Sequence, residues 1–342
     1  MLIPFLIPFV IAIFLSITMG GSGTAPAFSA AYGANVIKKN LIPGLFGLMV
    51  FLGAITGGKE TAKTIGKGLL SPELMSFSIV SIILLSVAFS LLIANLFGIP
   101  QSTSQATVMA VTAPALYFDS LNSDKLLYEI IPTWFVMPLL SFVLAYMAGK
   151  YIYRPIRKRG YTISKKINNS YILKGLILAM SMYVAFSIGT NNVANAAGPL
   201  SSMACIELNV AKNQYLQVLI LATLIVAPSF SIGSSIFGDK IVQNTGKQIV
   251  LFGKIEAVII AFISASLLLG ASLIKGIPTS LVQLNVGAII GIGVAKLGFR
   301  NIFKKTEVDR FFIMWIIAPI IAFLLSLFFT YLIDQSGLLH IQ

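Results

Sequence analysis

Two runs of small polar residues interrupt apolar sequence at residues 20–27 and 189–196. The first reads GGSGTAPA and the second GTNNVANA. Burying an amide without a hydrogen-bond partner is costly, so neighbouring Asn side chains in apolar surroundings favour a binding role over a purely structural one. Hydroxyl and amide donors at this spacing suit a small anion. The candidate binding residues here are Ser22, Gly23, Thr24, Asn191, Asn192, Val193 and Asn195.

A second pair of runs places hydroxyl and amide groups directly after Gly-Ile-Pro. GIPQSTSQATV covers residues 98–108 and GIPTSLVQLNV covers 276–286. Proline here should end or start a helix. One such cluster is explained equally well by helix capping, but four clusters in corresponding places favour a binding site. The candidates in this pair are Ser102, Thr103, Ser104, Gln105, Thr279, Ser280 and Gln283.

The composition identifies the elements that must position these residues. Of the 342 residues, 57% are hydrophobic and 10% are charged, against roughly a quarter charged in soluble domains. A membrane-spanning helix needs about 20 predominantly apolar residues, and stretches of this kind recur along the chain. Together with the low share of charged residues, they exclude a soluble globular protein. We expect an all-α polytopic protein of the cell membrane, whose first stretch is a retained span. The stretches are 2–19, 41–57, 76–97, 131–149, 171–188, 213–233, 255–274 and 311–333.

Much of the net charge of +13 is explained by the orientation of the chain in a membrane, because Lys and Arg collect in cytoplasmic loops. Lys and Arg lie between apolar stretches, which argues against a nucleic-acid partner. Residues 154–166 hold six of these bases and no acid, so this loop is expected in the cytoplasm, and the more acidic 119–129 outside. A single Cys and a single His leave no disulfide framework or His cluster. We therefore expect no cofactor or bound metal, and an enzyme is disfavoured.

The chain resembles itself at an offset of 170–180 residues. Both pairs of polar runs correspond in order, as do 58–67 with 238–247 and the segments that begin at Trp134 and Trp315. This pattern predicts a first transmembrane repeat at 1–153, a basic linker at 154–170 and a second repeat at 171–342. An odd number of crossings per repeat would invert the second one. Paired, interrupted apolar segments are typical of secondary transporters with a site between the repeats, and a channel remains an alternative.

Glycine and proline at the polar runs predict broken or re-entrant helices. Irregular backbone at membrane depth is tolerated where it lines a cavity. The N–H groups that begin a half-helix carry partial positive charge, so they can form an anion pocket without Lys or Arg. The residues expected to interrupt the helices are Gly20, Gly21, Gly23, Pro26, Gly189, Gly198 and Pro199.

The segment GTNNVANAAGPL resembles the GANDVANA-type signature of the inorganic phosphate transporter (PiT) family, and the Pro-x-Ser runs resemble its second signature. The resemblance implies an inverted-repeat carrier of a tetrahedral oxyanion, coupled to a cation gradient. Where the family signature has Asp, this chain has Gly23 and Asn192, and Gln105 and Gln283 stand where the family often has His. These neutral motifs resemble those of the family's sulfate-permease branch, and they place sodium coupling in doubt.

The charge of the substrate gives a physical reason for the neutral motifs. Phosphate near neutral pH carries protons that a carboxylate can accept, whereas sulfate is a dianion that needs donors only and is repelled by Asp in a low dielectric. We expect import of inorganic sulfate. The alternatives are a sodium- or proton-coupled phosphate symporter and an anion channel, with thiosulfate or molybdate as other oxyanions. A homodimer in the lipid bilayer is left open.

Coupling to a cation is expected because each negative charge moved against the membrane potential costs about 2.3 kcal/mol per 100 mV. A proton is the natural candidate. Glu256, in LFGKIEAVII, and Glu73 are the candidate coupling residues. An acid at a helix start also suits the helix dipole without any coupling role.

Overall fold

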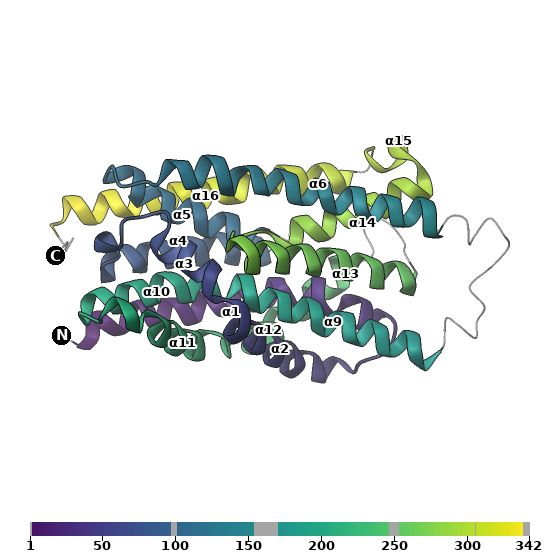
Figure 1. Ribbon diagram of the computed structural model, residues 1–342, viewed down its shortest axis with the longest axis horizontal. Coiled ribbons are helices and arrows are strands. Elements are labelled where there is room, and N and C mark those ends of the chain that lie inside the picture. Colours follow the sequence, from purple (N-terminus) through teal and green to yellow (C-terminus); the bar gives the residue numbers. More distant parts are fainter. Residues whose placement is uncertain (1, 97–100, 154–169, 246–252, 305, 338–342) are drawn as a thin grey trace.

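The chain forms an elongated bundle of helices. The computed structural model describes residues 2–96, 101–153, 170–245, 253–304 and 306–337 (Figure 1). The helices of the first half are α1 (Leu2–Gly33), α2 (Ile42–Gly57), α3 (Lys59–Lys67), α4 (Phe77–Leu96), α5 (Thr103–Tyr117) and α6 (Ile131–Met147). Those of the second half are α9 (Tyr171–Asn192), α10 (Ala194–Glu207), α11 (Tyr215–Val226), α12 (Ser229–Thr245), α13 (Lys254–Gly270), α14 (Leu281–Leu297), α15 (Phe299–Ile302) and α16 (Thr306–Gln335).

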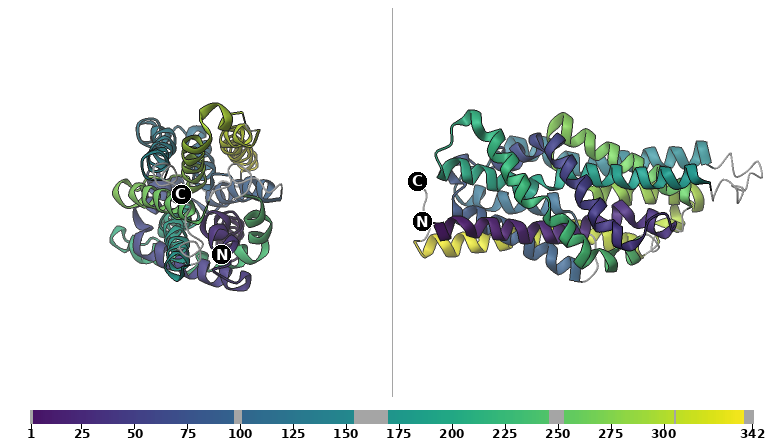
Figure 2. Two further views of the ribbon diagram at one scale, coloured as in Figure 1. Left: turned by 90° about the vertical axis from the view of Figure 1, so that its right-hand side faces the viewer. Right: turned by 90° about the horizontal axis from the view of Figure 1, so that it is seen from below.

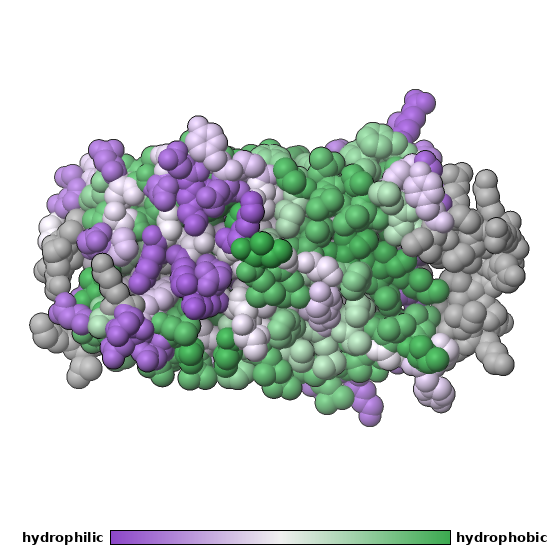
Figure 3. All heavy atoms as spheres, viewed as in Figure 1, coloured by the Kyte–Doolittle hydropathy of each residue, from purple (hydrophilic) through white to green (hydrophobic). Residues whose placement is uncertain are grey.

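The predicted all-helical, multi-span class is confirmed. Within the described residues, eight helices are long and apolar enough to cross a membrane. Large apolar side chains, such as Phe135 on α6 and Ile316 on α16, are exposed on the outside of the bundle. Hydrophobic residues cover much of the face seen in Figure 3, and hydrophilic residues gather towards one end. Apolar exposure on this scale is that of a surface that faces lipid.

Corresponding helices of the two halves run in opposite directions. α1 starts at the end of the bundle where α16 ends, whereas α9 starts at the opposite end (Figure 1). α6 and α16 are opposed in the same way. The inverted repeat stays a prediction, and these are the directions that it requires. Most of the predicted linker, 154–170, lies outside the described residues.

The two halves interlock. α1 packs against α12 and α2 against α9, while α5 packs against α16 and α14 against α6. Each pair joins one helix from residues 1–153 to one from 171–342. The left view of Figure 2 looks along the long axis of the bundle and shows its helices side by side. The polar runs of both halves are thereby brought to the centre of one molecule.

The expected break in the first span is absent, since α1 is a continuous helix through Gly20 and Pro26. Glycine serves close packing there. A Cβ atom at Gly20 would overlap the backbone carbonyl of Phe230 in α12, and one at Gly189 would overlap that of Val50 in α2. The second run is interrupted only at Val193, between α9 and α10. Tight helix crossings therefore explain glycines that the sequence also allowed as helix breaks.

Candidate functional site

Two helices begin inside the fold, at the Gly-Ile-Pro runs. Ser102 caps α5, where its hydroxyl oxygen accepts a hydrogen bond from the Gln105 backbone N–H at 3.2 Å. Ser280 caps α14 through the Gln283 N–H at the same distance. The other backbone N–H groups in the first turn of each helix have no partner within the helix and point out of its start. The positive end of the helix dipole lies at the same place. Of the first run, 98–100 lies outside the described residues.

The starts of α5 and α14 face each other. Gln105 Nε2 donates to Gln283 Oε1 at 3.2 Å, and Gln283 Nε2 donates to Gln105 Oε1 at 2.8 Å. Both side chains are buried. This reciprocal amide pair holds the two helix starts together, with their positive ends converging on one region.

A small polar cavity lies against these helix starts. The space between its side chains amounts to about 290 Å³, which includes space open to solvent. Its walls come from α1 and α9 on one side and from the starts of α5 and α14 on the other. The polar cavity is lined by Ser22, Gly23, Pro26, Gln101, Thr103, Ser104, Ile188, Asn192, Ser280, Leu281 and Val282. This lining contains no acidic or basic side chain, so the cavity can attract an anion through neutral donors alone.

A buried hydrogen-bond network supports one wall. Ser104 Oγ donates to Asn191 Oδ1 at 2.9 Å, and Asn191 Nδ2 donates to Ser272 Oγ at 2.8 Å. Asn191 is fully buried. It ties α9 to the start of α5 and to the segment after α13, and so acts on the cavity through Ser104.

Asn192 lies on the cavity wall itself. Its side-chain oxygen has no hydrogen-bond partner among the described residues, although the residue is 9% exposed. A buried carbonyl oxygen without a partner is costly, which marks Asn192 as a group that meets a ligand. Towards an oxyanion, the donor of this amide is its Nδ2 and not the unpaired oxygen. Ser22 also faces the cavity, but its hydroxyl donates to the Met19 carbonyl of its own helix.

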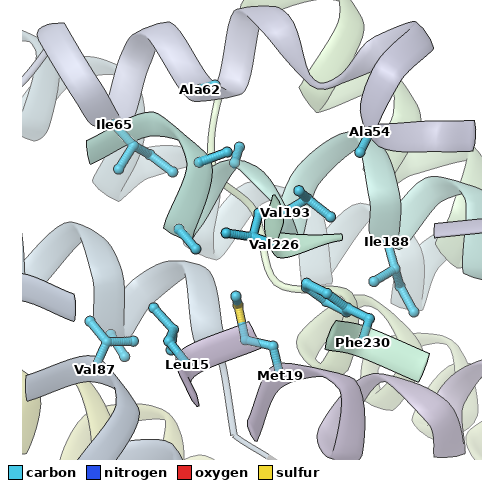
Figure 4. Packing of buried hydrophobic residues seen from close by; sticks show 14 of the residues in the cluster. Leu15, Met19, Ala54, Ala62, Ile65, Val87, Ile188, Val193, Val226 and Phe230 are labelled. Atoms are coloured by element: carbon cyan, nitrogen blue, oxygen red, sulfur yellow. The ribbon is translucent and has the colours of Figure 1, made fainter. Parts of the chain in front are cut away.

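The other candidates lie away from the cavity lining. Thr24 donates to the Gly20 carbonyl and lies beside Gly238 of α12. Thr279 donates to the Ile277 carbonyl. Val193 is part of the apolar core, seen from close by in Figure 4. Asn195 is fully buried on α10, with both polar atoms unpaired among the described residues.

Sequence reasoning missed Gln101, which lines the cavity and donates to Ser90 Oγ at 3.3 Å. The signal was its position between Pro100 and the Ser-Thr run. It also missed the apolar part of the wall, because Ile188 and Leu281 resemble any other core residue.

The acidic candidates lie outside the polar cavity. Glu256 is fully buried in the first turn of α13, where it accepts a hydrogen bond from the Gly253 backbone N–H. It also forms an ion pair with Lys296 of α14, with Oε1 and Nζ 2.7 Å apart. Glu73 is exposed in the short helix Pro72–Leu74. Among the described residues, no group of three or more Asp, Glu, Cys or His side chains could hold a metal.

The spans and the enclosed cavity define a multi-pass membrane transport protein. Residues 19–326 match the model of the phosphate transporter family. The chain is 34% identical over 319 residues to the sulfate permease CysP of Bacillus subtilis, covering 92% of this chain and 84% of that one. The chain belongs to the phosphate transporter family.

A solved structure has the same fold. The sodium-dependent phosphate transporter superposes with a TM-score of 0.81 over 97% of this chain and 99% of that chain, at 20% sequence identity. The two proteins therefore share their architecture although most of their residues differ.

Proposed function

We propose that this protein imports inorganic sulfate across the cell membrane by alternating access. The observation that carries the proposal is the uncharged polar cavity at the facing starts of α5 and α14. Helix N-termini with hydroxyl and amide side chains bind a tetrahedral oxyanion without a fixed positive charge. The similarity to CysP supports the same substrate.

The choice of sulfate over phosphate depends on the lining of the cavity. A protonated phosphate benefits from an acceptor such as a carboxylate, but no Asp or Glu among the described residues lines the cavity. Sulfate carries no proton near neutral pH and needs donors only. The alternative function is a cation-coupled phosphate symporter, and the fold shared with the sodium-dependent phosphate transporter supports this alternative.

The position of the cavity supports alternating access. One wall belongs to α1 and α9, which pack with α12 and α2, and the other to α5 and α14, which pack with α16 and α6. Relative movement of these two sets of helices would open the cavity to one side of the membrane at a time.

The test is uptake of radiolabelled sulfate by the purified protein in proteoliposomes. We expect uptake that excess thiosulfate or molybdate reduces and excess phosphate leaves unchanged. Phosphate uptake that sulfate does not affect would overturn the choice of substrate. Counterflow of labelled sulfate against an outward gradient would exclude a channel, because an open pore cannot produce it.

A further inference from the structure

A second cavity adjoins the polar cavity and shares Pro26 with it. This inner cavity lies between α1, α9, α13 and α14, and the space between its side chains, open solvent included, amounts to about 510 Å³. Its lining is mostly apolar, with three polar side chains: Ser29, Ser181 and Asn285. The two cavities are thus neighbours along α1, α9 and α14.

The inner cavity extends from the polar cavity in one direction. Along α1, Ser22 and Gly23 line the polar cavity, and Ser29 and Ala30, which line the inner cavity, follow them. Since α1 runs towards the end of the bundle where α9 starts, and α9 directly follows the basic segment 154–169 in the sequence, the inner cavity lies on the side of that start (Figure 1). The sequence predicts that this basic segment is cytoplasmic.

Asn285 occupies a distinctive position in the inner cavity. It lies on α14 one turn beyond Leu281 and Val282, which line the polar cavity. Its side chain is part-exposed and makes no hydrogen bond to another described residue. An anion that leaves the helix starts would therefore meet the Asn285 amide next.

The corresponding path in the other half of the molecule is closed. Aligning 98–108 with 276–286 pairs Asn285 with Thr107, which is fully buried and donates to the Thr103 carbonyl. On that side of the polar cavity, Leu15 and Met19 of α1 and Val87 of α4 are fully buried in one apolar cluster (Figure 4). Two related halves thus have opposite states, one open and one packed.

We propose that the inner cavity is the release path for the transported anion and that Asn285 contacts the anion on it. This inference rests on the proposed function and deepens it by assigning a direction and a residue. A mostly apolar wall with a few neutral donors binds a dianion more weakly than the helix starts do, which favours release over retention.

Thiol labelling tests the path, because the chain has a single cysteine, Cys205. In a Cys205→Ala background, Asn285→Cys and the matched control Thr107→Cys are exposed to a membrane-impermeant anionic thiol reagent in inside-out vesicles. We expect Asn285→Cys to react at least about tenfold faster, as an open position does relative to a packed one, and sulfate to slow its reaction. An unfolding temperature close to that of the parent protein shows that each variant is folded before labelling.

Equal labelling of the two folded variants, with intact sulfate uptake by the Cys205→Ala background, would overturn the path and leave the proposed function standing. Protection of Asn285→Cys by phosphate and not by sulfate would leave the path standing and remove the sulfate assignment. Protection by neither ion would overturn the contact with Asn285.

A charge at Asn285 provides a second test that needs no reagent. Asn285→Asp is expected to lower the sulfate uptake rate about tenfold or more through like-charge repulsion, while Asn285→Gln keeps most of it. Wild-type uptake by Asn285→Asp, at an unchanged unfolding temperature, would contradict the contact.

Discussion

At the scale of single residues, the account depends on neutral donors where the family signature has an acid. Asn192 is the clearest case, because it lines the polar cavity and its amide carries a donor, Nδ2, beside an oxygen that has no partner among the described residues. The side chain of the neighbouring Asn191 is instead hydrogen-bonded to Ser104 and Ser272. Two adjacent asparagines thus have different tasks, contact with the ligand and support of the wall.

Asn192→Asp should reduce sulfate uptake sharply. Two unit charges 4 Å apart repel by about 4 kcal/mol at an effective dielectric constant of 20, which exceeds the contribution of a single hydrogen bond. The measurement is the initial rate of sulfate uptake in proteoliposomes with and without sodium, and sodium dependence is expected to appear. Unchanged uptake would place Asn192 outside the binding site.

At the scale of the element, the reciprocal amide pair fixes the two helix starts. Gln283→Leu should destabilise the protein by about 1–3 kcal/mol, because it leaves the buried Gln105 amide without its partner. Replacing both residues by Leu should recover much of this loss. Thermal unfolding of the two single variants and the double variant measures the coupling, and strictly additive losses would show that the pair does not act as a unit.

The helix crossings of α1 and α9 give a second prediction at this scale. Gly20→Ala should destabilise the protein by about 1–3 kcal/mol, because the added methyl group overlaps the Phe230 carbonyl. Gly175→Ala is the matched control, since nothing lies within 4 Å of its added Cβ. It should be neutral or stabilising, as Ala favours a helix. Equal effects of the two changes on the unfolding temperature would argue against the tight crossing.

The sequence predicts those structural elements that depend on residues adjacent in the chain. Ser102 and Ser280 were placed at helix starts because proline and a capping hydroxyl act on their own neighbours. Gly20 was misjudged as a helix break because its partner, Phe230, is distant in sequence, and glycine suits either a break or a close crossing. The sequence does not predict that Ile188 and Leu281 line the cavity, because their place depends on packing between the two halves, which are distant in sequence.

At the scale of the whole molecule, import of a dianion requires a compensating cation. Glu256 is better placed than Glu73 for this task, because it is buried and next in sequence to Ala257, which lines the inner cavity. We propose that a proton couples transport through Glu256, and sodium is the alternative ion.

Glu256→Gln should abolish the stimulation of sulfate uptake by an inward pH gradient while counterflow exchange continues. Loss of the ion pair with Lys296 should also cost about 1–3 kcal/mol of stability, less than for a fully buried pair because the lysine is 16% exposed and can reach water. Glu73→Gln is the control and should keep the pH dependence. An intact gradient dependence in Glu256→Gln would remove this residue from coupling.

The central claim is that the polar cavity at the starts of α5 and α14 binds the transported oxyanion. The most direct measurement is a crystal structure with selenate, a sulfate analogue whose selenium is located by its anomalous signal. We predict a peak between Asn192 and Ser280, within reach of the α14 backbone N–H groups. A selenium peak elsewhere in the protein, with the polar cavity empty, would contradict the account.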